Sequence, residues 1–260
     1  MGHIHLHNIP QSKQWRDVVG LITDGAAVAQ IAAASAKAAE HGLMKAADDD
    51  ALAYSFWLLT QMPQAARQED FGSQLRALGL RVSDKPTLLE ITAAFTEAID
   101  RRVREAGRRT DIGEMAQLAA AESVSALVGR ELPSLFGPSA EDVQTAFRKL
   151  GTSDRFSVLA RDFFSRLTSR SLGYFLSREL PRHVGPGRRF ADLGEHGAFN
   201  AALDLHCREA SRIIKEFSGG WYGKTLFREG QISPEKARLF AHVAFKKIRA
   251  ELRKRRDLVE

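Results

Sequence analysis

The sequence predicts an all-α protein, because its apolar residues recur every three or four positions along nearly the whole chain. Few segments show the strict alternation of apolar and polar residues that is typical of strands. With 260 residues, of which 44% are hydrophobic, the chain is long enough to bury a sizeable core. We therefore expect a multi-helix, bundle-like fold behind a short extended segment at residues 1–12.

Capping residues indicate where individual helices begin. Thr87 precedes Glu90 by three residues, the spacing of a capping box, and Gly107 ends that helix. Asp111 and Glu114 repeat the spacing at the start of the next helix. A serine hydroxyl can accept a hydrogen bond from an unpaired amide in the first turn of a helix. We therefore expect further helices to begin at Ser139, at Ser153 and, ahead of Pro234, at Ser233.

Prolines and charge divide the chain near its middle. Residues 131–139, ELPSLFGPS, combine two prolines and a glycine, which are typical of a connection between domains. Residues 1–130 hold 14 Lys and Arg against 16 Asp and Glu, whereas residues 131–260 hold 24 against 16. We expect a helical N-terminal domain at 13–137 and a basic helical C-terminal domain at 138–260. The positive field of the second half favours nucleic acid, acidic proteins or anionic lipid heads, unless it serves solubility alone.

Composition also bears on the cellular location. The longest weakly polar run, residues 24–42, is broken by Gln30 and Lys37 and falls short of the roughly 18 to 20 strongly apolar residues of a membrane span. The single cysteine cannot form an internal disulfide bond. We therefore expect a soluble, cytoplasmic protein with no membrane span.

Motifs of common enzymes are missing from the sequence. It contains no P-loop, no His-Glu-x-x-His motif and no cysteine pair, so we expect no cofactor and no enzymatic activity of the chain alone. The group Asp204, His206 and Cys207 leaves open an enzyme of unrecognised type. Adjacent helical residues point about 100° apart, which is poor geometry for a nucleophile and its base. A packed thiol beside a surface histidine is the alternative.

One candidate binding loop combines glycines with arginines. Residues 182–189 place Arg182, His183, Arg188 and Arg189 around a Gly-Pro-Gly turn. Converging amides and guanidinium groups would bind a phosphate or a carboxylate. Alternatively, the segment ends a helix and its arginines bond to neighbouring carbonyls or acids.

A second glycine-rich loop is expected at SGGWYGK, residues 218–224, where Trp221 and Tyr222 stand ahead of Lys224. If the two rings are exposed, they would stack on a base or anchor a partner. If they are buried, they fill the core where helices diverge.

The last predicted helix is strongly basic. Residues 236–256 hold nine Lys and Arg against one acidic residue, and Lys246, Arg249, Arg253 and Arg256 line one of its sides. Compensation of the helix dipole explains only part of this surplus. The remainder indicates a nucleic acid, an acidic partner or an anionic surface.

Five strings in the C-terminal half carry a family resemblance: RDFFSRLTSRSLGYFLSREL, HVGPGRRF, ALDLHCREASRII, GGWYGK and PEKARLFAHVAFKKIRAEL. With them, residues 150–255 resemble the B component of Qat-type bacterial antiphage operons, whereas residues 1–130 do not match its Gly/Ser/Pro-rich N-terminal region. The resemblance implies a non-catalytic subunit of an antiviral defence complex, encoded beside an ATPase and a QueC-like enzyme of deazaguanine chemistry. A nucleic-acid-binding protein outside defence is the alternative.

The resemblance also bears on the first residues, MGHIHLHNIP. Removal of Met1 would leave Gly2 as a free amine, and the resemblance implies that a QueC-like partner attaches a deazaguanine to such a glycine. His3, His5 and His7 are marginal metal candidates, because a histidine in second place spoils the N-terminal spacing that copper or nickel requires. An ordinary short strand or frayed end is the alternative.

Overall fold

The structure is a computed structural model that describes residues 12–39, 48–107, 109–133 and 137–257. Within these residues every element is a helix, apart from one isolated bridge between Val184 and Phe190, so the all-α prediction is confirmed. The helices are α1 (Lys13–Thr23), α2 (Val28–Ala38), α4 (Asp50–Ala65), α5 (Phe71–Ala77), α6 (Leu88–Ala106), α7 (Asp111–Gly129), α8 (Ala140–Leu150), α9 (Ser153–Leu176), the 3-10 helix η1 (Leu180–His183), α10 (Leu193–Ala210), α11 (Arg212–Glu229) and α12 (Pro234–Asp257).

Hydroxyl caps begin several of these helices, as the sequence predicts. The Ser139 hydroxyl accepts from the Asp142 amide at 3.1 Å, and the Asp142 carboxylate accepts in return from the Ser139 amide at 2.9 Å. At α6 Thr87 caps the Glu90 amide at 3.2 Å, but the Glu90 carboxylate instead accepts from the amide and hydroxyl of Ser83.

Two predicted caps are displaced by one residue. Thr110 caps α7 in place of Asp111, accepting from the Gly113 amide at 3.0 Å, and Thr152 caps α9 in place of Ser153. Threonine and aspartate or serine are both good caps, so adjacent candidates cannot be separated by residue type alone.

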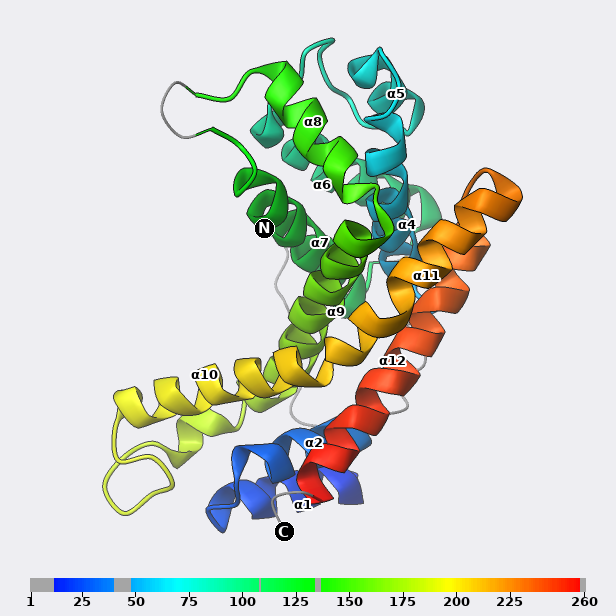
Figure 1. The fold of residues 1–260 in the computed structure, drawn as a ribbon. Helices are drawn as coiled ribbons and strands as arrows, with labels where there is room; N and C mark the ends of the chain where they lie inside the picture. The colour runs from blue at the N-terminus through cyan, green and yellow to red at the C-terminus, as the bar shows by residue number, and fades with distance from the viewer. Residues whose placement is uncertain (1–11, 40–47, 108, 134–136, 258–260) are drawn as a thin grey trace.

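Helix α9 runs through the middle of the molecule and packs against α7, α10 and α11 (Figure 1). Helices α4 to α8 gather at one end, and α11 and α12 lie antiparallel along one side. At the other end α1 and α2 pack beside the C-terminal part of α12. The end of α9, η1 and α10 project as an arm, with the loop of residues 184–192 at its tip (Figure 1).

Aromatic side chains join the two halves of the chain. The ring of Phe56 on α4 lies 5.7 Å from that of Phe163 on α9 and 5.1 Å from that of Phe240 on α12, measured between centroids. Buried apolar residues from both sides of residue 137 belong to one continuous core cluster. The division into domains at 13–137 and 138–260 stays a prediction.

The segment SGGWYGK is part of helix α11 and not the loop that its glycines predicted. Two of its three glycines, Gly219 and Gly223, pack closely on α9 instead. A Cβ on Gly219 would lie 2.5 Å from the Ser153 carbonyl oxygen, and one on Gly223 would lie 2.6 Å from the Ser153 hydroxyl. A residue without a side chain is therefore required at Gly219, where the obstructing atom is backbone, and the sequence alone did not separate this role from a turn.

Candidate functional site

The structure places the predicted anion loop at the tip of the arm. Arg182 and His183 lie in η1 and both face Glu179, at 3.2 and 3.0 Å. The Arg188 guanidinium donates to the carbonyl of Arg182, and that of Arg189 donates to the carbonyl of Ala26 at 3.0 Å. Arg189 thereby ties the loop to the connection between α1 and α2.

The backbone amides of this loop bond within it. The Gly185 amide donates to the Phe190 carbonyl at 2.8 Å, the Arg188 amide to the Gly185 carbonyl at 3.0 Å, and the Phe190 amide to the His183 carbonyl at 2.9 Å. Gly185 and Gly187 have positive φ angles of 131° and 70°, which glycine tolerates best. An anion at this loop would have to compete with these bonds, and anion binding here stays a prediction.

The aromatic pair of α11 belongs to the core. Tyr222 is buried and stacks on Phe156 at 3.8 Å between ring centroids. Its hydroxyl accepts from Gln64, and burial raises its pKa to about 12. Trp221 is half-buried, 4.4 Å from the ring of Phe240, whereas Lys224 is exposed.

The three reactive residues of α10 face different surroundings. Cys207 is fully buried, and burial raises the pKa of its thiol to about 12. Asp204 is exposed and accepts a hydrogen bond from Ser169 on α9. His206 is half-buried, and burial followed by the charge of Arg255 lowers its pKa. The side chains therefore do not form the nucleophile–base arrangement of a thiol enzyme.

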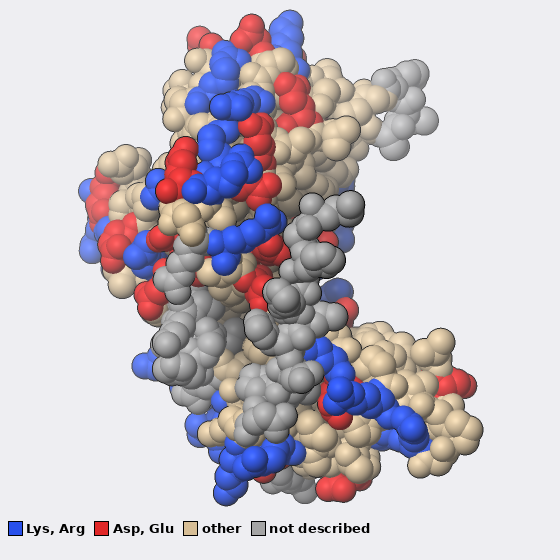
Figure 2. Space-filling model, turned by 180° about the vertical axis from the view of Figure 1, so that it is seen from behind, with Lys and Arg blue, Asp and Glu red and all other residues tan. Residues whose placement is uncertain are grey.

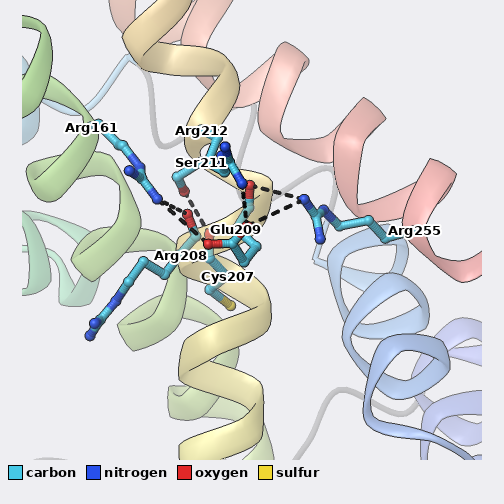
Figure 3. A network of polar contacts seen from close by, with 7 residues as sticks. All are labelled: Arg161, Cys207, Arg208, Glu209, Ser211, Arg212 and Arg255. Carbon is cyan, nitrogen blue, oxygen red and sulfur yellow. Dashed lines mark hydrogen bonds and ion pairs between the residues drawn. The ribbon is translucent and has the colours of Figure 1, made fainter.

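A group that sequence reasoning missed lies where α10 meets α11 (Figure 3). Glu209, near the end of α10, is approached by Arg212 at 3.1 Å, by Arg161 of α9 at 3.8 Å and by Arg255 of α12 at 3.8 Å. The exposed Arg208 is adjacent and points away from the carboxylate (Figure 3). We call these five residues the Glu209 cluster.

The Glu209 cluster holds four positive charges against one negative charge, a surplus of three. Arg161 and Arg255 also donate to the carbonyls of Arg208 and Glu209, at 3.3 and 3.4 Å. The buried Nε atoms of Arg161 and Arg255 have no hydrogen-bond partner in the described part of the chain. Surplus guanidinium groups of this kind bind phosphate and carboxylate groups well.

The predicted basic residues of α12 lie along its length. Lys246 and Arg253 are exposed, and Arg249 is half-buried. The side chain of Arg256 lies outside the described residues, as do Gly2, His3, His5 and His7. Within the described ranges no three His, Cys, Asp or Glu residues are grouped so that they could hold a metal ion.

A space-filling view shows how charge is distributed on the rear face of the molecule (Figure 2). Lys and Arg are interleaved with Asp and Glu over the upper helices, whereas a band of Lys and Arg crosses the lower part with few acidic neighbours. Positive potential is therefore concentrated in some regions of the surface rather than spread evenly.

None of the helices in the described ranges combines the length and the apolar character that crossing a membrane requires. Comparison of the chain with family models, curated proteins and solved structures gives no match. The resemblance to the B component of Qat-type operons therefore stays a prediction.

Proposed function

We propose that the chain is a non-catalytic docking subunit that binds an acidic partner protein through the basic surface of its C-terminal half. The observation that carries the proposal is the pair Lys246 and Arg253 on α12. Both are exposed, and neither has an acidic partner among the described residues, while Leu239 and Val243 of the same helix are exposed beside them.

Four other bases of α12 form ion pairs within the molecule: Lys236 with Glu229, Arg238 with Asp50 at 2.9 Å, Lys254 with Glu251 at 2.8 Å and Arg255 with Glu209 at 3.8 Å. The exposed Lys247 instead lies over the ring of Phe217, with its Nζ 5.2 Å from the ring centroid. Acidic groups of a partner would be attracted to the charges that remain, and exposed apolar groups between them would add contact area.

In the family setting the partners would be an ATPase and a QueC-like enzyme of an antiviral defence operon, with Gly2 as the acceptor of a deazaguanine. This part of the proposal rests on the resemblance of residues 150–255. The full burial and raised pKa of the Cys207 thiol support a non-catalytic role against the thiol enzyme that the sequence left open.

Nucleic acid is the second candidate partner, and the Glu209 cluster favours it. Three arginines around one carboxylate, with Arg208 beside them, offer more guanidinium donors than Glu209 accepts, and phosphate groups match their planar geometry. Binding through such contacts weakens steeply as salt rises, because counterions are released from the nucleic acid.

The test is a double charge reversal, Lys246→Glu with Arg253→Glu. The matched control, Lys85→Glu with Arg130→Glu, changes the charge by the same amount at exposed positions outside α12. Each protein is co-expressed with an ATPase and a QueC-like protein of a Qat-type operon, the partners that the resemblance implies, and binding is also measured to a DNA duplex. We expect the α12 variant to lose at least about tenfold in partner affinity and the control to keep it.

Equal partner binding by the parent and by both variants would overturn the role of α12. Nucleic acid would be identified as the partner by a different result. In that case the parent binds the duplex in a salt-sensitive way and binds no partner protein, and Arg161→Gln with Arg208→Gln abolishes the binding to the duplex. Circular dichroism of each variant checks that helix content is unchanged, as expected for surface substitutions.

A further inference from the structure

The outward face of α12 repeats with the spacing of a helix-pairing surface. Five of its exposed residues follow one another at intervals of four, three, four and three positions: Leu239, Val243, Lys246, Ala250 and Arg253. This is the period of 3.5 residues at which one helix presents a continuous seam to another. We call these five residues the α12 stripe.

The first residues of the stripe are exposed, whereas Arg253 at its end lines a groove with α1 and α2. Phe240 packs on Trp221 of α11, Arg238 pairs with Asp50 of α4, and Arg255 reaches Glu209 of α10. By contrast, Leu239 is 55% exposed and Val243 is 44% exposed. These two apolar side chains lie one turn apart, so a partner helix can cover both at once.

Basic side chains border the stripe on both edges, two of them with an acidic partner: Lys254 pairs with Glu251 and His242 with Asp48. Lys247 and Lys254 flank it on one side, and His242 and Arg249 flank it on the other, at the positions that correspond to e and g of a heptad. Charges at these positions select the partner helix, so a partner with Glu or Asp at its own e and g positions is favoured.

The C-terminal end of the stripe lies beside a groove that is also basic. This groove, of about 350 Å³, is bounded by α1, α2 and α12, and its lining residues are Gln14, Asp17, Ala33, Ala34, Lys37, Arg249 and Arg253. Three bases face one acid there, so an acidic group at the end of a bound helix would be attracted.

We infer that the α12 stripe binds one amphipathic helix of a partner protein, whose apolar heptad positions are flanked by Glu and Asp. The inference rests on the proposed docking function and identifies the element that docks. A second copy of this chain is a poor occupant, because Lys246 and Arg253 would face like charges. Nucleic acid is disfavoured because Leu239, Val243 and Ala250 along the centre offer no donors to phosphates.

The probe is a synthetic peptide of three heptads with Leu at positions a and d, Glu at e and g, and Lys at b and c. The control peptide is an isomer in which Glu and Lys exchange places, so composition and apolar seam are the same. Binding to the full chain is measured by fluorescence anisotropy at low salt. We expect the first peptide to bind at least about tenfold tighter than the isomer.

Variants of the protein locate the site. Leu239→Glu and Val243→Glu each place a carboxylate in the stripe. Each should lower the affinity for the first peptide at least about tenfold. Phe227→Glu on α11 and Leu118→Glu on α7 are matched controls, because these residues are 92% and 49% exposed on other helices. Both control variants should bind the first peptide with the affinity of the parent.

Equal affinity for the two peptides, or binding that survives both seam variants, would overturn the inference. The inference would also be overturned, in favour of a surface that binds phosphate groups, if a DNA duplex at equal charge concentration displaced the peptide and Leu239→Glu left peptide binding unchanged. The docking function is decided separately by Lys246→Glu with Arg253→Glu on the partner proteins. That function survives if those reversals abolish partner binding while Leu239→Glu does not.

Discussion

Two adjacent glycines of α11 should respond in opposite directions to the same substitution. A Cβ on Gly220 meets no atom within 4 Å, whereas one on Gly219 would lie 2.5 Å from the carbonyl oxygen of Ser153 and 3.4 Å from the Cβ of Ser157. Both positions are interior to the helix, so alanine raises helix propensity equally, by about 0.8–1 kcal/mol. Only Gly219→Ala adds a clash with the backbone of α9.

The clash sets the difference between the two variants. Overpacking of a tight contact typically costs about 1–3 kcal/mol, and here the obstructing atom is backbone of the first turn of α9, which cannot rotate away like a side chain. We expect Gly220→Ala to raise the free energy of unfolding by up to about 1 kcal/mol. The free energy of unfolding of Gly219→Ala should be about 1–3 kcal/mol lower than that of Gly220→Ala.

Urea unfolding followed by circular dichroism measures both changes against the parent. The comparison cancels helix propensity, because that gain is shared by the two variants. A difference below about 0.5 kcal/mol, the usual size of a surface effect, would refute the assigned contact between α11 and α9. It would also restore the possibility that SGGWYGK is a loop.

Two further predictions concern α10. Cys207 should resist alkylation by iodoacetamide at pH 8 in the native protein and react rapidly in urea, because it is fully buried with a thiol pKa of about 12; rapid native alkylation would contradict this. The pKa of His206 is lower in the folded protein than in the unfolded chain, so as pH falls the imidazole is protonated first in the unfolded chain. The free energy of unfolding should therefore fall as pH drops below about 6.5. The loss is at most about 1.4 kcal/mol per pH unit, and it is smaller for a half-exposed ring. Urea unfolding at pH 7.5 and 5.5 should show a smaller loss in His206→Gln, and equal losses would exclude His206 as the cause.

The periodicity of the sequence predicted the fold because it records which side of each helix is buried. Phe156, Phe163 and Phe240 are core residues in the structure, as their spacing indicates. Local capping patterns predicted Ser139 well because its partner Asp142 is three residues away. Where two residues of similar chemistry are adjacent, as at Thr110 and Asp111, the sequence did not determine which one caps.

Contacts between distant segments were out of reach of the sequence. The strings around Glu209 contain Arg208 and Arg212, but Arg161 and Arg255 stand almost fifty residues away on either side. Nothing in a local pattern indicates that α9 and α12 bring both guanidinium groups to one carboxylate. The glycines of α11 were misread for the same reason, since the required neighbour, Ser153, is on another helix.

Counting charges along the chain therefore overestimates how much of the basic half can meet a partner. Among the residues counted as basic candidates, Arg182 pairs with Glu179, and Arg188 and Arg189 donate to backbone carbonyls. These groups are largely committed to holding the arm together, and a partner would have to break those bonds to use them. Lys246 and Arg253 carry no such cost within the described residues, and they alternate with exposed apolar side chains. Because a docking partner gains most where charge and apolar surface need no rearrangement, α12 is favoured over the arm as the docking element.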